Sequence, residues 1–213
     1  MRGGSQVTQQ GLNFSGVPVT VETPLSEQEV RECGLAYIKT FVEDWHYSHS
    51  VFGITGRRFF CVTVRDELVG AAIFGIPAGM GVSEKYDPDG LGLLELRRFV
   101  MVDDLPKNSE SRCLGAMFRT LKASGVGIIL SYADPNHGHV GTIYKATGFE
   151  YRGTTDARKH VRWRGRLYPD RNIHQVNFPY HLELRQALAD GTATLENVPG
   201  KHVYTKVLAR RTC

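Results

Sequence analysis

The side chains best suited to proton transfer and hydrogen bonding are crowded into one short segment. They are Asp134, His137, His139 and Tyr144. The segment follows an apolar run at residues 126–130, typical of a buried strand, and a short predicted helix within it stops at Gly148. Ligands of open α/β sheets bind outside the carboxyl ends of the strands. We therefore expect the chemistry of this protein here.

Asp134 has a structural interpretation as well as a chemical one. It precedes Pro135, and Asp-Pro commonly opens a turn. A turn does not require the imidazoles of His137 and His139, however, and their presence favours a functional site.

Two further groups have open interpretations. His46 and Tyr47 end an apolar helical pattern, so spacing alone favours a histidine at the helix C-terminus and a packed tyrosine. Glu95 and Arg97 alternate onto one face of a predicted strand, with Arg98 on the other. A Glu95–Arg97 ion pair is one explanation; the other is that one arginine binds a phosphate or carbonyl oxygen, and the sequence does not choose between Arg97 and Arg98.

Tyr144 also has a packing role. If Gly148 ends the helix in the left-handed conformation, Tyr144 and Phe149 make the hydrophobic contact of that motif.

A basic segment near the C-terminus predicts nucleic-acid binding. Six of the fourteen residues 158–171 are Lys or Arg, and Asp170 is the one acid. Such a segment neutralises phosphates, and its aromatic rings could stack on bases; a solvated basic loop is the alternative. The predicted DNA-binding residues are Arg158, Lys159, Arg162, Trp163, Arg164 and Arg166.

The elements that position these residues alternate between strand and helix. We predict strands at residues 59–64, 68–76, 93–101 and 126–130 and a short edge strand at residues 17–21. We predict one helix at residues 26–45 and a second that contains residues 114–121 and ends near Gly125. The first helix would start with a capping box at Ser26 and Glu29. This order predicts an α/β or α+β fold with one mixed central sheet flanked by helices.

The bulk properties limit the class of protein. The chain of 213 residues suits one domain, with residues 1–15 flexible and residues 154–213 forming a basic, partly extended region. No apolar run is long enough for a membrane span, and the four cysteines are scattered, which suits buried thiols in a reducing cytoplasm. The oligomeric state stays open, with a homodimer among the alternatives.

The element order, together with Tyr144-Lys-Ala-Thr-Gly-Phe149, resembles the acyl-CoA-dependent N-acetyltransferase (GNAT) superfamily. A narrower resemblance covers roughly residues 25–210. Trp45-His-Tyr-Ser48, Glu95-Leu-Arg-Arg-Phe99 and Ser131-Tyr-Ala-Asp-Pro135 with Gly138-His-Val-Gly-Thr-Ile-Tyr144 are similar to the Mom proteins of Mu-like phages.

That resemblance implies an enzyme that adds a carbamoylmethyl group to the exocyclic amine of adenine in double-stranded phage DNA, in the bacterial host cytoplasm, and so blocks restriction. It implies Asp134 as a base or hydrogen-bond acceptor for the amine, His46 and Tyr47 in the active site, and Arg97 or Arg98 orienting the donor. Tyr144 would protonate a leaving thiolate or orient the donor, which the superfamily implies is acetyl-CoA.

The loop before the second long helix departs from the glycine-rich phosphate loop of typical acetyltransferases. Asn108 or Ser109 would cap this helix and leave free N–H groups for a phosphate, with charge from Lys107 and Arg112. The predicted cofactor-binding residues are Lys107, Asn108, Ser109, Ser111 and Arg112. No metal ligand is assigned; iron stays open because joining carbon to nitrogen through a methylene differs from forming an amide.

Two other functions remain open. One is a conventional N-acetyltransferase of a protein or small amine, and the other is a non-catalytic DNA-binding protein that keeps the fold.

Overall fold

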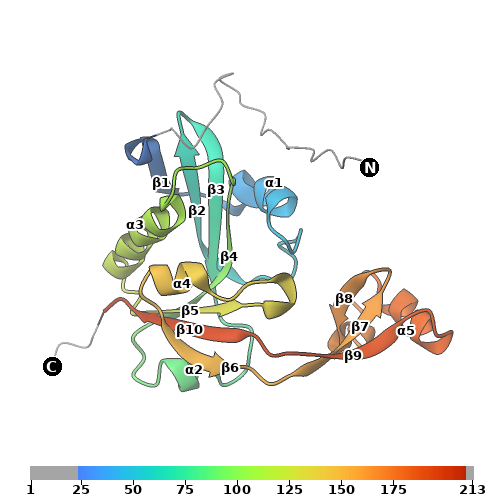
Figure 1. Ribbon diagram of the computed structural model, residues 1–213. Helices are drawn as coiled ribbons and strands as arrows, with labels where there is room; N and C mark the ends of the chain where they lie inside the picture. Colours follow the sequence, from blue (N-terminus) through green and yellow to red (C-terminus); the bar gives the residue numbers. More distant parts are fainter. Residues whose placement is uncertain (1–23, 210–213) are drawn as a thin grey trace, which may run out of the picture. The chain divides into compact units, whose positions relative to one another are not determined.

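A computed structural model describes residues 24–209 (Figure 1). By its internal contacts the chain divides into two compact units. The first contains the described residues up to Ser131, with Ile143–Glu150 and the chain from Thr205 onward; the second contains Tyr132–Thr142 and Tyr151–Tyr204. The expected flexible residues 1–15 and the strand expected at residues 17–21 lie outside the described residues, and the single-domain organisation stays a prediction.

The sheet of the first unit combines an antiparallel part with a parallel pair. The antiparallel strands are β1 (Gln28–Glu32), β2 (Gly56–Val64), β3 (Glu67–Gly75) and β4 (Leu93–Met101). Next in order come β5 (Ile128–Ala133), parallel to β4, and then β10 (His202–Val207). β4 agrees with the predicted strand at residues 93–101, and the two-residue turn at Arg65 and Asp66, both at positive φ, confirms the predicted β2–β3 hairpin.

Two long helices cover opposite faces of this sheet (Figure 1). α1 (Leu35–Trp45) buries Ile38 and Val42 against Ala71 and Ile73 of β3. α3 (Ser109–Ala123) buries Phe118, whose ring meets Phe74 edge to face at 6.5 Å. Because both faces are covered, β3 is apolar along nearly its whole length, and burial of this kind stabilises by about 25 cal/mol per Å² of apolar surface.

The predicted start of the first helix was wrong. Leu25–Glu27 form a 3₁₀ turn, Gln28–Glu32 pair with β2 as an edge strand, and α1 begins only at Leu35, after Gly34, without a side-chain cap. Pairing with β2 gives the backbone groups of Gln28–Glu32 hydrogen-bond partners without a helix. The end of the helix at Trp45 was predicted correctly.

The second unit has a smaller sheet with its own core. β7 (Arg158–Trp163) lies between β8 (Arg166–Pro169) and β9 (Thr194–Val198), both antiparallel to it. β6 (Glu150–Thr154) is instead the last strand of the larger sheet, next to β10. The core members are Val161, Trp163, Leu184, Ala187 and Ala193, with α5 (His181–Ala189) supplying Leu184 and Ala187.

The remaining elements are short. They are the α-helices α2 (Val82–Tyr86) and α4 (Thr142–Ala146) and the 3₁₀ turns Pro135–His137 and Asp170–Ile173. Among residues 24–209, no helix combines the length and apolar character needed to cross a bilayer.

Candidate active site

His46 lies at the end of α1 in a fixed orientation. It is 6% exposed, and its Nδ1 lies 2.8 Å from the hydroxyl of Ser48 and accepts the Ser48 backbone N–H at 3.1 Å. An acceptor Nδ1 leaves the proton of the neutral imidazole on Nε2. The ring of Tyr47 lies beside it, with the ring centroids 4.2 Å apart and the planes tilted by 33°. The sequence pattern alone favoured a helix C-terminal histidine, and the backbone N–H of His46 does donate to Val42 at that end.

Arg98 lies beside Tyr47 because β4 contains one residue more than the facing part of β3. Ile73 pairs with Arg98 and Phe74 pairs with Leu96, so Arg97 is a bulge with no partner in β3. A bulge turns the neighbouring side chains away from strict alternation. Arg98 donates from Nε to the Ser50 carbonyl at 3.1 Å; burial lowers the pKa of its guanidinium, and the Tyr47 phenol beside it acts in the opposite direction.

Arg97 takes the structural role that the sequence had left open. Its Nε lies 3.3 Å from Oε1 of Glu95, and both side chains are mostly buried. Its guanidinium also donates to the Ile76 carbonyl. The two arginines therefore differ: Arg97 neutralises Glu95, and Arg98 lies with His46 and Tyr47. We call His46, Tyr47 and Arg98 the His46 cluster.

The bulge coincides with the end of pairing between β4 and β5. The parallel ladder runs from Leu93 and Ile128 to Leu96 and Ser131, and the Ser131 hydroxyl donates to the Leu96 carbonyl at 3.3 Å. Arg98 thus follows the last paired residue of β4 closely. This is the edge of an α/β sheet where ligands bind.

In the second unit, Asp134 is the first residue of the polar loop, which we define as residues 134–141. Its Oδ1 accepts hydrogen bonds from the backbone N–H and the side-chain amide of Asn136, at 3.0 and 2.9 Å. The prediction that Asp134 opens a turn is therefore confirmed. Its Oδ2 lies 2.9 Å from Nζ of Lys201.

The charge state of Asp134 follows from these contacts. Burial, the largest single influence, would raise its pKa, but the bonds from Lys201 and Asn136 together lower it below the ordinary value. The carboxylate is therefore ionised at neutral pH and is better suited to accept a hydrogen bond than to take up a proton. Lys201 escaped sequence reasoning because it lies far along the chain, with no spacing that connects it to Asp134.

Tyr144 lies in α4, one turn before Gly148, as predicted. Gly148 has φ 73°, the Phe149 N–H donates to the Tyr144 carbonyl at 2.9 Å, and the Gly148 N–H donates to Lys145 at 3.1 Å, which together define a Schellman motif. The Tyr144 and Phe149 rings are 5.3 Å apart, and Phe149 in turn contacts Phe118 of α3.

Asn108 occupies the N-cap position of α3, as one of the two predictions had it, but no side chain among the described residues caps the helix. Asn108 has φ 72°, while the buried Ser109 hydroxyl donates to the Pro106 carbonyl and accepts from Nε2 of Gln28 at 2.5 Å. Arg112 donates to the Gln28 carbonyl at 2.9 Å. Ser109 and Arg112 thus attach β1 to α3. The roles of Lys107, Asn108, Ser109, Ser111 and Arg112 in binding a cofactor stay predictions.

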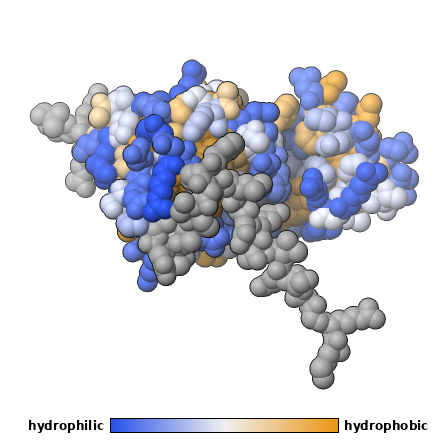
Figure 2. Space-filling view, turned by 90° about the horizontal axis from the view of Figure 1, so that it is seen from above, coloured by the Kyte–Doolittle hydropathy of each residue, from blue (hydrophilic) through white to orange (hydrophobic). Residues whose placement is uncertain are grey.

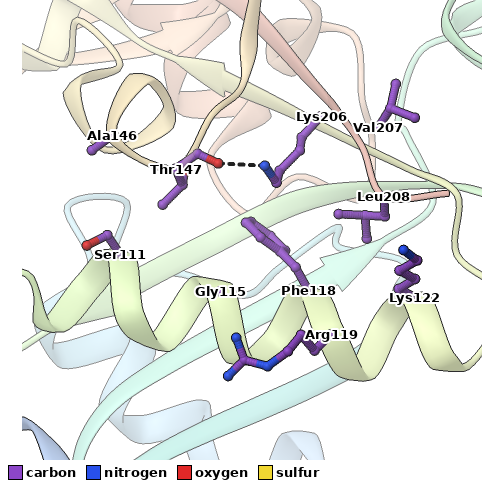
Figure 3. Close-up of a pocket in the computed structure, with 10 residues that line it drawn as sticks. All are labelled: Ser111, Gly115, Phe118, Arg119, Lys122, Ala146, Thr147, Lys206, Val207 and Leu208. Carbon is purple, nitrogen blue, oxygen red and sulfur yellow. Dashed lines mark hydrogen bonds between the residues drawn. The ribbon is translucent and has the colours of Figure 1, made fainter.

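Ser111 lines a cavity of about 380 Å³ in the first unit, between α3, the end of α4 and β10 (Figure 3). Its cationic lining residues are Arg119, Lys122 and Lys206, and the lining contains no acidic side chain. In Figure 3, Phe118 rises from α3 toward Lys206, whose ammonium group donates to the Thr147 carbonyl at 2.7 Å. This volume is in the range of small-ligand pockets, and the charge suits a phosphate. Arg119, Lys122 and Lys206 were missed, because isolated basic residues carry no motif.

The basic segment of the second unit is a hairpin, formed by β7 and β8. Its exposed basic residues are Arg158, Lys159, Arg162, Arg164 and Arg166. Arg162 is paired with Glu196 at 2.6 Å, which neutralises part of the charge. Figure 2 shows many hydrophilic side chains, with hydrophobic ones among them, on the visible surface of the second unit.

Trp163 lies in the core of this unit instead of on its surface. It is 9% exposed, packs among the core residues of α5, and carries the Arg164 guanidinium over its ring at 4.3 Å. Strand alternation explains this, because Val161 and Trp163 share the face toward α5 while Arg162 faces away. Its predicted stacking on a base does not agree with this burial.

Some predicted groupings stay predictions. The His46 cluster and Tyr144 belong to the first unit and Asp134 to the second, so their convergence on one pocket is one of them. Within residues 24–209, no group of three or more His, Cys, Asp or Glu side chains could hold a metal ion.

Comparisons with known proteins agree on the family and the fold. The model of a family described as the Mom protein family matches residues 27–212. The methylcarbamoylase mom of Escherichia phage Mu is 29% identical over 133 residues, which are 61% of this chain and 54% of the relative. The chain thus spans about half the length of this curated relative.

Two solved acetyltransferases share the fold. The ribosomal-protein-S18-alanine N-acetyltransferase of Escherichia coli has a TM-score of 0.50 at 11% identity and covers 87% of this chain and 96% of its own. The IAA acetyltransferase of Bacillus cereus also has a TM-score of 0.50, at 8% identity, and the match covers 84% of this chain and 99% of its own. These likenesses show the fold alone, a GNAT-like mixed sheet flanked by helices.

Proposed function

The chain belongs to the Mom protein family, and from that premise we propose that it is a transferase that modifies phage DNA. The reaction is addition of a carbamoylmethyl group to the exocyclic amine of adenine in double-stranded DNA. The observation that carries this proposal is the extent of the family match, residues 27–212, which includes the His46 cluster, the polar loop and the basic hairpin. The name of the phage Mu relative, a methylcarbamoylase, supports the identity of the transferred group.

The biological consequence follows from where the group would be attached. The adenine N6 amine is one of the groups that distinguish base pairs in the major groove. A bulky substituent there removes a hydrogen-bond donor that a restriction enzyme reads. The modified phage DNA is thereby protected in the host cytoplasm.

The proposed donor is acetyl-CoA, which would supply the two carbon atoms of the carbamoylmethyl group. The α3 cavity fits its phosphate groups, because Arg119, Lys122 and Lys206 line it and no acid does. Ser111, at the first turn of α3, adds a hydroxyl group. Tyr144 is connected to the cavity wall through the rings of Phe149 and Phe118, which agrees with its assignment near the donor.

The proposed roles at the reacting centre follow from the contacts. Arg98, held by the Ser50 carbonyl, orients a carbonyl oxygen of the donor, and Tyr47 and His46 stabilise charge beside it. Asp134, ionised, accepts an N–H of the adenine amine. Tyr144 orients the bound donor. A carbamoylmethyl group is joined to N6 through its methylene carbon, so acyl transfer with a departing thiolate would give acetylated adenine and is not the proposed step.

DNA access requires the base to leave the duplex. An enzyme that acts on an amine inside the double helix must extrude the nucleotide, which costs a few kcal/mol. The exposed arginines of the β7–β8 hairpin supply phosphate contacts that offset this cost.

The test is mass spectrometry of nucleosides digested from the DNA of cells that express the protein. A new adenine adduct with the mass of a carbamoylmethyl group supports the proposal. The GNAT-like fold favours one alternative, a conventional N-acetyltransferase, and that function predicts acetylated protein or small amine with unmodified DNA. Retained DNA binding without any product would indicate a non-catalytic protein.

A further inference from the structure

We propose that Lys201 is a positioning residue for Asp134: its ammonium group holds the second carboxylate oxygen in the direction and charge state needed to accept the N–H of the substrate amine. This proposal rests on the proposed function.

The two oxygens of Asp134 have separate partners. Oδ1 takes both hydrogen bonds from Asn136, and these define the turn. Oδ2 is held by Lys201 at 2.9 Å. The hydrogen bonds from Asn136 are enough to form the turn. The ion pair with Lys201 is therefore not needed for the turn, and its effect is on the carboxylate itself.

The ion pair with Lys201 affects the charge of Asp134 because the carboxylate is buried. The side chain of Asp134 is 10% exposed and that of Lys201 is 46% exposed. A buried carboxylate without a cationic partner is costly and takes up a proton instead. Lys201, reaching in from solvent, keeps the carboxylate ionised. The other titratable groups of the polar loop are His137 and His139, whose backbone N–H groups donate to the Asp134 carbonyl at 3.1 Å.

The backbone of Lys201 is held firmly enough to serve this role. Its N–H donates to the Thr155 hydroxyl and its carbonyl accepts the Thr155 N–H, both at 2.9 Å. At Gly200, an added Cβ would lie 1.7 Å from the Thr155 carbonyl oxygen, so this close approach requires glycine.

The same segment also holds the other end of the polar loop. Tyr204, 2% exposed, donates from its hydroxyl to the Val140 carbonyl at 2.8 Å. The loop that carries Asp134 is thus fixed at both ends by residues 201 and 204, and only the lysine contact involves the carboxylate.

The test compares Lys201→Met, Lys201→Arg and Gly200→Ala with the unaltered full-length protein and with Lys39→Met, which removes an exposed lysine paired with Glu43. The first readout is the pKa of Asp134 from carbon-detected NMR of labelled aspartate, which needs no activity. We expect Lys201→Met and Gly200→Ala to raise it, and Lys201→Arg and Lys39→Met to leave it near the original.

The second readout is adduct yield against pH. Below the raised pKa, the yield of Lys201→Met should fall about tenfold for each pH unit while the unaltered protein remains active, and Lys201→Arg should restore it. An Asp134 pKa that does not move in Lys201→Met overturns the proposal, as does a pH profile unchanged by that substitution. If Lys201→Met does not fold, the same criteria apply to Gly200→Ala. Absence of adduct from the unaltered protein would count against the proposed function, while the NMR readout still decides whether Lys201 controls Asp134.

Discussion

Arg98 donates from Nε to the carbonyl oxygen of Ser50 across 48 positions of sequence, at 3.1 Å. This bond joins the loop after α1 to the bulge of β4 and places a half-buried guanidinium beside Tyr47. Arg98 is thereby separated in role from Arg97, its neighbour in the chain.

Replacing Arg98 by Met should reduce adduct yield about 10²-fold, the usual effect of removing one donor from charge stabilisation at a reacting centre. Arg98→Lys should not restore it, because an ammonium group lacks the planar fork of guanidinium. Nucleoside mass spectrometry measures the yield, with thermal unfolding as the control for folding. A yield within twofold of the original would contradict the assignment.

The stability of the fold should decrease in acid partly through Asp134. Its folded-state pKa is lowered, so its contribution is fully present above the unfolded-state pKa and is lost as pH falls through the folded-state value, below the ordinary 3.8. Urea unfolding from neutral pH down to about pH 2 measures this. Asp134→Asn should show a smaller loss over that range; an identical loss would mean that Asp134 does not contribute.

Two glycines of the polar loop provide a matched pair. Gly141 and Gly138 have φ of 77° and 74°, but a Cβ at Gly141 would lie 2.4 Å from the Tyr204 ring, whereas one at Gly138 meets nothing within 4 Å. Gly138→Ala should cost about 1 kcal/mol from backbone strain, and Gly141→Ala about 2–4 kcal/mol because overpacking adds to it. Urea denaturation compares them, and equal costs would exclude the steric contribution.

The α3 cavity should bind coenzyme A through its phosphates. Changing Arg119 and Lys122 together to Glu should weaken binding at least tenfold, since each charge-assisted hydrogen bond contributes about 1.5–3 kcal/mol. Calorimetric titration with coenzyme A measures this, and Lys85→Glu, an exposed lysine of α2, is the control. Unchanged affinity would place the cofactor elsewhere.

Changing Arg162, Arg164 and Arg166 together to Ala should flatten the salt dependence of DNA binding. Each phosphate contact contributes about 0.9 to the slope of log affinity against log salt. Arg162 should contribute least, because Glu196 already pairs with it. Fluorescence anisotropy at several salt concentrations tests this, with Lys39→Ala and Lys85→Ala combined as the control. An unchanged slope removes the hairpin from the DNA contact.

Local signals predicted much of the fold. The turn at Arg65 and Asp66 and the helix end at Gly148 depend on neighbouring residues alone, and both are confirmed. Ser26 and Glu29 were misjudged because their capping-box spacing is also compatible with an edge strand, and pairing with β2 decides between the two.

The candidate site was less predictable, since its contacts join distant segments. Asp134 could be found from its position after a buried strand, but its partner Lys201 could not. The choice between Arg97 and Arg98 depends on a bulge that has no mark in the sequence. Trp163 was misplaced because the basic segment had no evident strand alternation until β7 was seen to pack against α5.

Arg97 has no backbone partner in β3, so the number of residues in β4 is itself a functional property of the strand. Deleting that one position would give β3 and β4 an uninterrupted ladder and would remove the local bend and extra twist that a bulge adds beside Arg98. Glu95 would lose its ion pair with Arg97, and Arg98 would take the i+2 spacing from Glu95 that Arg97 now has, although no residue of the His46 cluster had been substituted. The number of residues in β4 therefore sets the surroundings of Arg98 as much as their types do.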